Sequence, residues 1–369
     1  MRAVRYLVAA LGLAAAVGAA SASGARGVQT LYTSTAGPIA AFAQDDSLVA
    51  WVGSTGRHRC NAVRLLSVSG ARVDVTLPQP GTDNVTCRWN VGDGAVRLAI
   101  AASTTADAAL WTLHQKAQIS TDYVVGATAR KPLERRFQQV AHTNAGAGLW
   151  LGGISGSGTT LVYGTAAVSY VDQLSCLSGG SCAKKVSGGG ILRIVGRNET
   201  PLPGAGATVD VAAAAGHVAA IPATAVGKSG LPTASPGDPI SVRDASSGVV
   251  TAQVAPVGVA VSLALSQNVL AVLLRNGARS QIGWWDPSNG RLLGLVEVPA
   301  QTSSDLAASD QLVVFRVGRS IRGIDVSTGS IRQLAEGAAT PVGLSLVGTR
   351  LAWAENVRGV GRIRALELG

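Results

Sequence analysis

A repeat of about forty residues in the C-terminal half of the chain constrains the fold most strongly. Each copy has an apolar strand, an acidic residue, small turn residues, a glycine and a second strand. The copies are SVRDASSGVV from Ser241, GWWDPSNGRLL from Gly283 and RGIDVSTGSIRQL from Arg322. The acids Asp244, Asp286 and Asp325 lie 42 and 39 residues apart. Because Asp and Ser bond to their own backbone and Gly supplies positive φ, each copy predicts a hairpin.

A second repeated element, a short apolar strand entered by a polar turn, precedes these hairpins. Its copies are SLVAWV at Ser47, TTLVYGT at Thr159, GHVAAIPA at Gly216, NVLAVLL at Asn268, QLVVFRV at Gln311 and RLAWAEN at Arg350. A last partial hairpin places Glu367 another 42 residues after Asp325. A strand element and a hairpin that recur with this period are typical of four-stranded propeller blades.

We therefore predict an all-β chain whose residues 23–369 form one β-propeller domain with seven four-stranded blades. The predicted blades span residues 38–79, 80–140, 141–204, 205–256, 257–300, 301–339 and 340–369. The last span has room for three strands, so residues 27–35 are expected to supply the fourth and to close the ring. Closure removes exposed strand edges. Six or eight blades remain open, because the second and third spans are long and match the repeat poorly.

The runs TRLAWAENVRGVGRIRALELG and RGIDVSTGSIRQLAEG resemble the repeats of TolB-like and WD-repeat-like bacterial propellers. The resemblance covers the C-terminal half and the region from Pro38 to Leu77, whereas residues 80–200 match poorly. It implies a propeller fold and no particular activity, because the same motif occurs in proteins with unrelated functions. The Trp-Asp dipeptide that defines true WD repeats occurs once, at Trp285-Asp286.

Residues 1–22 have the pattern of a signal peptide. Arg2 and Arg5 precede an apolar stretch over residues 6–19, and Ala20-Ser21-Ala22 offers a cleavage site. We predict a secreted protein, periplasmic or associated with the cell wall, with no transmembrane anchor after cleavage. An uncleaved N-terminal anchor is the alternative.

The composition favours a large core and a basic surface. Apolar residues make up 47% and charged residues 14% of the chain, which excludes a disordered protein. Loss of the signal lowers the formal net charge from +10 to about +8. This charge suits anionic cell-envelope polymers or membrane surfaces. Nucleic acid is not expected, because the basic residues are spread out and no aromatic stripe accompanies them.

The four cysteines agree with an oxidising compartment. They permit three pairings, of which we favour Cys60 with Cys87 and Cys176 with Cys182, the latter flanking the short segment LSGGS. A metal site is the alternative, because His58 lies two residues before Cys60. No C-x-x-C motif and no second nearby ligand complete such a site.

We find no catalytic motif and expect no cofactor. The histidines His58, His114, His142 and His217 fall in different predicted blades. Nearly all of the aspartates are expected in turns, namely Asp45, Asp46, Asp93, Asp244, Asp286, Asp305, Asp310 and Asp325. The run GISGSGTT from Gly153 lacks the Lys-Ser/Thr and the helix of a phosphate-binding loop, so we interpret it as a hairpin. No G-x-S-x-G nucleophile motif is present.

Three features are candidate binding surfaces. Arg64, Arg193, Arg322 and Arg364 share one register, three residues before the turn of their blade, and are consistent with a ring of positive charge. Their alternative role is to reach solvent or pair with a neighbouring acid. Of Trp284 and Trp285, we expect one ring to be exposed and the other to pack between blades. The Cys176–Cys182 segment is either a binding loop or a neutral insertion.

These observations favour a monomeric, exported, non-enzymatic propeller that binds a protein or an anionic cell-envelope component through one face. The alternative is a propeller enzyme, a lyase or hydrolase acting on a polysaccharide or a small lactone in the central channel. A third possibility is a sensor or scaffold region of a larger envelope system. Histidines and acids clustered in an axial funnel would favour the enzyme.

Overall fold

The chain folds almost entirely into β-strands, so the predicted all-β class is confirmed. The computed structural model describes residues 27–34, 37–54, 60–67, 72–76, 97–102, 108–115, 120–128, 140–142, 147–179, 182–195 and 198–369. One helix, α1 (Gln173–Leu177), occurs in these residues. None of their helices is long and apolar enough to span a membrane. The predicted signal peptide, residues 1–22, lies outside the described residues.

The strands form seven four-stranded antiparallel sheets within the described part of the chain. The first three sheets are β2 (Ile39–Asp45), β3 (Leu48–Ser54), β4 (Cys60–Ser67) and β5 (Arg72–Thr76); β6 (Leu98–Ala101), β7 (Ala108–Gln115), β8 (Ser120–Thr128) and β9 (Val140–His142); and β10 (Gly148–Ser157), β11 (Thr160–Tyr170), β12 (Lys184–Val195) and β13 (Asn198–Pro201). Each of these three sheets pairs its strands in chain order.

The remaining four sheets contain the clear sequence repeats. They are β14 (Thr208–Ala214), β15 (His217–Pro222), β18 (Ile240–Asp244) and β19 (Val250–Val254); β20 (Val259–Leu265), β21 (Leu270–Asn276), β22 (Arg279–Trp285) and β23 (Leu292–Val298); β24 (Thr302–Ala308), β25 (Leu312–Val317), β26 (Ser320–Asp325) and β27 (Ile331–Glu336); and β28 (Pro341–Val347), β29 (Arg350–Val357), β30 (Val360–Glu367) and β1 (Gln29–Thr33). A small hairpin, β16 (Ala225–Val226) and β17 (Pro232–Thr233), is inserted between β15 and β18.

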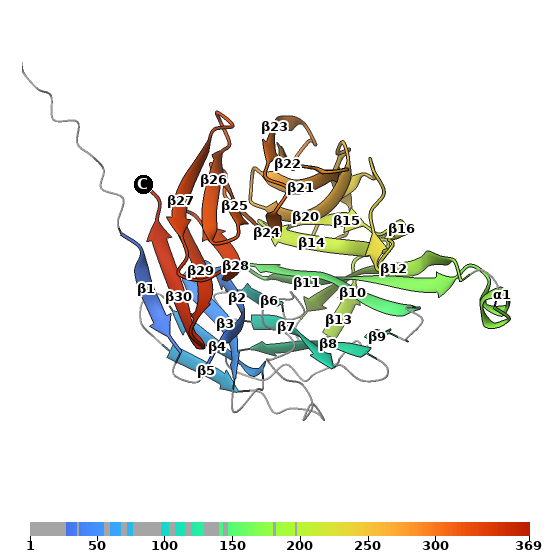
Figure 1. Cartoon of the computed structure of the whole chain (residues 1–369), viewed down its shortest axis with the longest axis horizontal. Helices are drawn as coiled ribbons and strands as arrows, with labels where there is room; N and C mark the ends of the chain where they lie inside the picture. The colour runs from blue at the N-terminus through green and yellow to red at the C-terminus, as the bar shows by residue number, and fades with distance from the viewer. Residues whose placement is uncertain are drawn as a thin grey trace, which may run out of the picture.

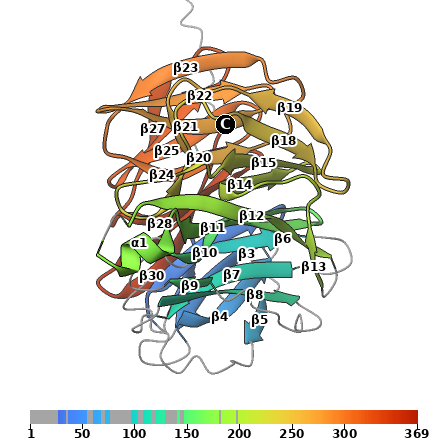
Figure 2. The ribbon, with the colours of Figure 1, turned by 90° about the vertical axis from the view of Figure 1, so that its right-hand side faces the viewer.

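The first strand of every sheet faces the centre of the molecule. These strands contact one another in the order β2, β6, β10, β14, β20, β24 and β28, and β28 contacts β2. Figure 1 shows them gathered around the middle of the ribbon, and Figure 2 shows the sheets following one another across the molecule. The inner strands are rich in Ala, Ser and Gly, as in TVDVAAA of β14 and TSSDLAA of β24. Small side chains allow seven strands to converge, and the result is a propeller-like fold.

The N-terminal strand β1 belongs to the same sheet as the end of the chain. It pairs antiparallel with β30, with Gln29 opposite Ala365 and Thr33 opposite Arg362. The ring of Tyr32 also packs on Trp51 of β3, with the two centroids 4.3 Å apart. Strand β1 therefore contacts both the last sheet and the first sheet. Its last residue, Thr33, precedes Trp51 by 18 residues in the sequence and precedes β30 by more than 300.

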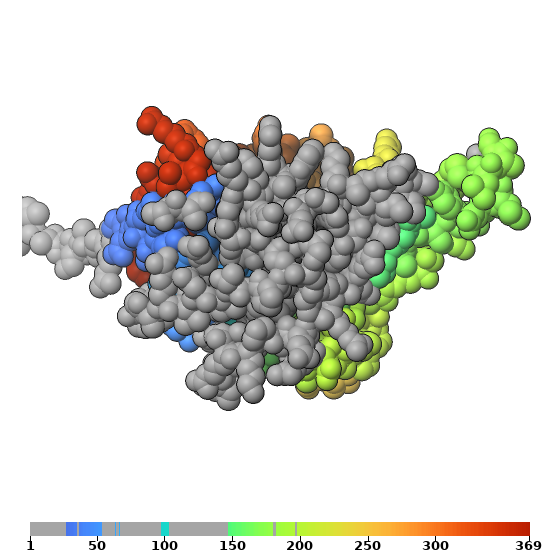
Figure 3. All heavy atoms as spheres, turned by 90° about the horizontal axis from the view of Figure 1, so that it is seen from below, coloured from blue at the N-terminus to red at the C-terminus, as the bar shows by residue number. Residues whose placement is uncertain are grey.

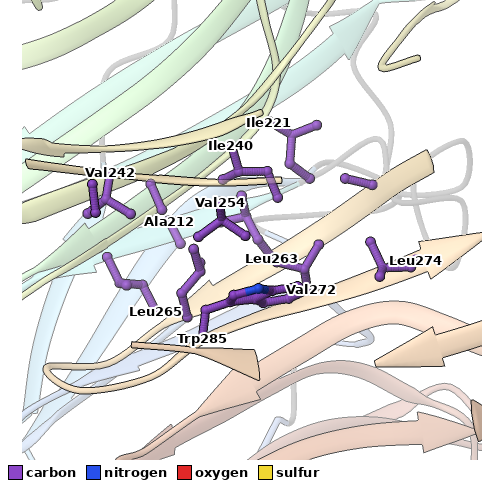
Figure 4. Packing of buried hydrophobic residues seen from close by; sticks show 14 of the residues in the cluster. Ala212, Ile221, Ile240, Val242, Val254, Leu263, Leu265, Val272, Leu274 and Trp285 are labelled. Carbon is purple, nitrogen blue, oxygen red and sulfur yellow. The ribbon is translucent and has the colours of Figure 1, made fainter. Parts of the chain in front are cut away.

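The hydrophobic core lies between neighbouring sheets. Figure 4 shows one such layer, in which residues of β15, β18 and β19 pack against β20, β21 and β22. Comparable layers join the second sheet to the third, the third to the fourth, the fifth to the sixth, and the sixth to the seventh. Another joins the seventh sheet to the first, where Trp51 packs with Ile363. The four largest fully buried side chains, Trp51, Trp353, Tyr163 and Phe315, lie on second strands. Each such burial stabilises the fold by about 1.5–3 kcal/mol.

The outer hairpin turns have the structure that the repeat predicts. In the turn between β22 and β23, Asp286 accepts hydrogen bonds from the amide and the hydroxyl of Ser288, at 2.9 and 2.6 Å. Gly290, at φ +74°, donates its N–H to the Asp286 carbonyl at 2.8 Å. Asp244 and Asp325 make the same bonds in their own turns. The predicted hairpins at these three acids are confirmed.

Candidate functional site

Two cavities lie among the first strands of the sheets, and we call them together the axial channel. The turn-side cavity, of about 600 Å³, is lined by the ends of the first strands and by turns that lead to the second strands. The bulge-side cavity, of about 470 Å³, lies at the opposite ends of the same strands. Ile154, Asp210 and Leu344 line both cavities. These three side chains therefore form the waist of the channel.

The bulge-side cavity takes its lining from an irregularity that recurs in the first strands. Six of them shift register against the second strand, between Ile39 and Ala41, Leu151 and Ile154, Thr208 and Asp210, Ala260 and Ser262, Thr302 and Leu306, and Pro341 and Leu344. A bulge changes the direction of the local side chains. The register shifts fall immediately before Asp210 and Ser262, where they interrupt the regular alternation of side chains between the two faces of the strand. Both residues line the channel.

Asp210 is the charged residue at the waist. Its carboxylate accepts the N–H of Leu263, from the next sheet, at 3.3 Å. Burial raises the pKa of Asp210, and the positive charge of Arg97 together with the N–H groups of Leu263 and Val211 opposes the rise. The Asp210 residue is half-buried, and it lines both cavities. Asp210 therefore links two sheets at the axis.

Two glycines of β10 make room for this contact. A Cβ atom on Gly153 would lie 1.8 Å from the Asp210 carboxylate and 2.8 Å from the backbone nitrogen of Val211. A Cβ atom on Gly152 would lie 2.6 Å from the Thr208 carbonyl. The glycine run from Gly153 thus permits two sheets to approach closely. Its later part forms the β10–β11 hairpin that we predicted, in place of a phosphate-binding loop.

Asp45, in the turn-side cavity, joins three sheets. From the end of β2 its carboxylate accepts the N–H of Ala102 at 2.8 Å, the N–H of Gly158 at 2.7 Å and the hydroxyl of Ser157 at 3.4 Å. Burial raises its pKa, although the bonds from Ala102, Gly158 and Ser157 oppose the rise. Its lone pairs are largely occupied by neighbouring sheets.

Asp310 repeats this arrangement on the other side of the same cavity. It accepts the hydroxyl of Ser266 at 2.8 Å, and the backbone and side-chain N–H groups of Asn268, both at 2.9 Å. Ser266 and Asn268 belong to the β20–β21 turn, whereas Asp310 belongs to the β24–β25 turn. The carboxylates of the turn-side cavity thus serve as ties between sheets.

Among the described residues, an ion pair and a hydroxyl without a hydrogen-bond partner line the bulge-side cavity. Arg316 Nε lies 2.6 Å from Asp305 Oδ2, across the β24–β25 pair. The hydroxyl of Ser262, which is 5% exposed, has no hydrogen-bond partner among the described residues. Asp305 lies within β24, so the expectation that it occupies a turn is wrong. No described group of three His, Cys, Asp or Glu side chains is arranged to hold a metal ion.

The structure places the predicted arginines on third strands. Arg193 donates to the carbonyl of Ala245 in the next sheet at 2.7 Å. Arg364 forms an ion pair with the fully buried Glu355 at 3.2 Å. Arg322 donates to Ser320 of its own strand at 3.4 Å. The side chain of Arg64 lies outside the described residues. The shared ring of charge stays a prediction.

Both tryptophans of the β22 pair are buried, so our expectation that one ring is exposed is wrong. Trp284 is 2% and Trp285 5% exposed. The Trp284 Nε1–H donates to the carbonyl of Val326 in the next sheet at 3.1 Å. Successive residues of a strand face opposite sides of the sheet, and in a propeller a neighbouring sheet covers each side. Neither ring belongs to a binding surface.

The cysteine predictions have separate outcomes. Cys176 and Cys182 form a disulfide, as predicted. It joins α1, which contains Cys176, to Cys182 at the tip of the long β11–β12 hairpin. Cys87 lies outside the described residues, as does the side chain of Cys60, so that pairing stays a prediction. His58 and the side chains of His114 and His142 also lie outside them.

Three axial residues were missed by sequence reasoning: Arg97, Asp210 and Ser262. The available signal for Asp210 was a charge in the middle of the apolar strand TVDVAAA, where turn chemistry does not account for it. Ser262 is likewise a polar residue in the middle of an apolar strand, VAVSLAL. Arg97 precedes the short strand β6 and carries no local signal.

No protein family model matches the chain, and no curated protein matches it. Several solved structures are similar at low identity. The computationally designed Ika8 protein is 14% identical over 90% of this chain and 98% of that chain, with a TM-score of 0.45. The WD40 β-propeller domain of Doa1 is 13% identical over 92% and 97%, with a TM-score of 0.49. A chain of a Mitotic Checkpoint Complex is 12% identical over 99% and 98%, with a TM-score of 0.46.

All three TM-scores are below 0.5, so these likenesses carry no argument about the fold, the partners or the activity of this chain. The fold assignment rests on the strand pairing and on the cyclic contacts of the first strands. The resemblance to TolB-like bacterial propellers stays a prediction.

Proposed function

We propose that the chain is an exported, closed seven-bladed β-propeller that acts as a non-enzymatic binding scaffold for a protein or a cell-envelope component. The cyclic contacts of the seven first strands and the pairing of β1 with β30 support the closed ring. The Cys176–Cys182 disulfide and the predicted signal peptide support export.

One observation carries the scaffold function. The carboxylates of Asp45 and Asp310 in the turn-side cavity, and of Asp210 at the waist, each accept hydrogen bonds from neighbouring sheets. A general acid or base needs an oxygen that reaches the substrate, whereas these oxygens are engaged in holding sheets together. The rest of the turn-side cavity is lined chiefly by Ala, Leu, Val, Ser, Gly and Gln side chains.

The alternative, an enzyme with its site in the channel, is favoured by one other observation. Asp45 and Asp210 both line the turn-side cavity, and burial raises the pKa of both carboxyls. Carboxyls with perturbed pKa values in a cavity are typical of hydrolase and lyase sites. Under this alternative, one carboxyl protonates the leaving group of a polysaccharide or lactone.

A turnover assay and a binding assay together test the proposal. The purified protein, with its disulfides formed, is incubated with neutral and acidic polysaccharides and a small lactone, while new reducing ends, unsaturated products and ring opening are measured. We expect no turnover above that of the Asp45→Asn/Asp210→Asn variant, and saturable binding to an isolated cell-envelope fraction. Turnover that the double substitution abolishes would establish the enzyme and overturn the scaffold.

A further inference from the structure

The β11–β12 hairpin extends beyond the rest of the molecule. Its strands contain 11 and 12 residues, whereas β21 and β22, in the same positions of the fifth sheet, contain seven each. Figures 1 and 3 show the hairpin and α1 projecting from one side of the molecule. We define the hairpin tip as residues 171–179 with Cys182 and Ala183. The tip is set apart from the core, so packing against the sheets does not explain its side chains.

The hairpin tip is held in one shape by local bonds. The N–H of Val171 donates to the carbonyl of Ala183 at 2.8 Å, and the Cys176–Cys182 disulfide closes the segment above it. Asp172 caps α1 by accepting the N–H of Ser175 at 3.0 Å. A segment ordered in this way loses little conformational entropy when it contacts a partner.

Apolar side chains on this tip face water. Val171, Leu174 and Leu177 are 58%, 79% and 77% exposed, and no residue of α1 is buried. The two leucines are the most exposed large apolar side chains in the described part of the chain. Leu174 and Leu177 are three residues apart within α1, which places them on one side of the helical turn. Val171 lies just before the N-cap Asp172 of the same helix. The tip thus presents a small, convex apolar knob.

Basic residues lie at the base of this knob. Lys184 and Lys185 follow it directly, and the Lys184 Nζ lies 5.8 Å from the centre of the Tyr170 ring. Lys184 also lies beside Gly230 of the inserted β16–β17 hairpin, which contributes Lys228. Between Tyr170 and Lys185 the sequence contains one acid, Asp172, and its carboxylate is occupied by the helix cap. The charge around the apolar knob is therefore positive.

We infer that the hairpin tip binds the surface of an anionic phospholipid bilayer, with its leucines inserted at the headgroup boundary and its lysines on the lipid phosphates. The inference deepens the proposed scaffold function, on which it rests, by naming the cell-envelope partner. An apolar knob with a basic collar has the chemistry of an interfacial membrane anchor. A protein partner would have to supply a groove for the knob, whereas a bilayer accepts a convex apolar surface without one.

Binding to lipid vesicles tests this inference. Cosedimentation is measured with vesicles of phosphatidylglycerol and phosphatidylcholine and with vesicles of phosphatidylcholine alone. The wild-type protein should bind the anionic vesicles more tightly. Leu174→Ser/Leu177→Ser should weaken that binding about tenfold, because two apolar side chains no longer enter the interface.

Matched control variants distinguish insertion of the hairpin tip from non-specific binding of exposed apolar side chains to the vesicles. Leu292 and Leu295 of β23 are 51% and 44% exposed, away from the hairpin. Leu292→Ser/Leu295→Ser should leave vesicle binding unchanged. Lys185→Gln should weaken binding to anionic vesicles about fivefold, whereas Arg332→Gln, at an exposed position of β27, should not. Equal unfolding midpoints for all variants would exclude loss of fold.

Each further outcome bears on a defined claim. The membrane inference is wrong if the wild-type protein does not bind anionic vesicles. It is also wrong if Leu174→Ser/Leu177→Ser and Leu292→Ser/Leu295→Ser change vesicle binding equally. If the tip variant instead loses binding to delipidated envelope protein, the membrane inference is wrong and the scaffold function stands. If the protein binds neither vesicles nor any envelope fraction, both fail.

Discussion

The outer hairpin turns and the axial channel use the same residue type in opposite ways. Asp244, Asp286 and Asp325 lie at the surface in the outer turns. Each accepts a hydrogen bond from the hydroxyl of the serine two residues later in the chain, and this bond lowers the pKa of the aspartate. Along the axis, burial raises the pKa of Asp45 and Asp210, whose partners lie in other sheets. The outer acids shape one hairpin each, whereas the axial acids connect hairpins to one another.

This difference concerns sequence distance as well as charge. Asp286 finds its partners within three residues, and the same local solution recurs with the repeat. Asp45 finds the N–H of Gly158 at a separation of 113 residues. We therefore expect that changes in the outer turns destabilise one hairpin, whereas axial changes that remove a contact between sheets destabilise the whole ring. Three predictions follow this contrast, from the largest expected effect to the smallest.

Gly153→Ala should destabilise the protein most. The added methyl collides with the Asp210 carboxylate and with the backbone of Val211, so two sheets must separate, at a cost of about 3 kcal/mol. Gly329→Ala, in an outer turn at φ +71°, should cost about 1 kcal/mol. Gly206→Ala, which meets no atom within 4 Å, is the control. Chemical denaturation measures all three, and equal losses for Gly153 and Gly329 would contradict the contrast.

A double-mutant cycle on Asp310 and Ser266 measures one tie between sheets. We expect a coupling free energy of about 1 kcal/mol, because the 2.8 Å bond joins two turns that no backbone pairing connects. The matched cycle on Asp325 and Ser327 should give a smaller value. There the Gly329 N–H still closes the turn on the Asp325 carbonyl at 2.8 Å. A larger coupling in the outer turn would reverse our interpretation.

The pH dependence of stability should differ in sign between the two regions. The raised pKa of Asp210 means that its charged form opposes folding at neutral pH, and that this opposition disappears as the pH falls through the folded-state pKa. Asp210→Asn should therefore raise the free energy of unfolding at pH 7, and its advantage should shrink in mild acid.

The lowered pKa of Asp325 has the opposite consequence. Its stabilising contribution is present above the pKa of the unfolded chain, about 3.9, and is lost as the pH falls through the lower folded-state value. Asp325→Asn should therefore destabilise the protein at pH 7, and the loss should disappear in strong acid. Denaturation curves at several pH values measure both variants, and parallel pH profiles would refute the assigned environments.

The outer turns could be predicted from the sequence because every partner of Asp244 or Asp325 lies within a few residues. The second strands could be predicted for the same reason, since SLVAWV and QLVVFRV each begin at a polar turn. The axis could not, because the role of Asp210 appears only when sheets distant in sequence meet at the bulge beside Gly153. The burial of Trp284 and Trp285 was likewise misjudged, because the covering sheets are contributed by other repeats.

Closure of the ring by the N-terminal strand is the central claim, and an engineered disulfide tests it most directly. Thr33 of β1 lies opposite Arg362 of β30. In the variant Thr33→Cys/Arg362→Cys, mild oxidation should produce an intramolecular bond between these two cysteines, identified by peptide mapping, and should raise the midpoint of unfolding. Two free thiols, or a cross-link formed only between molecules, would contradict a closed ring.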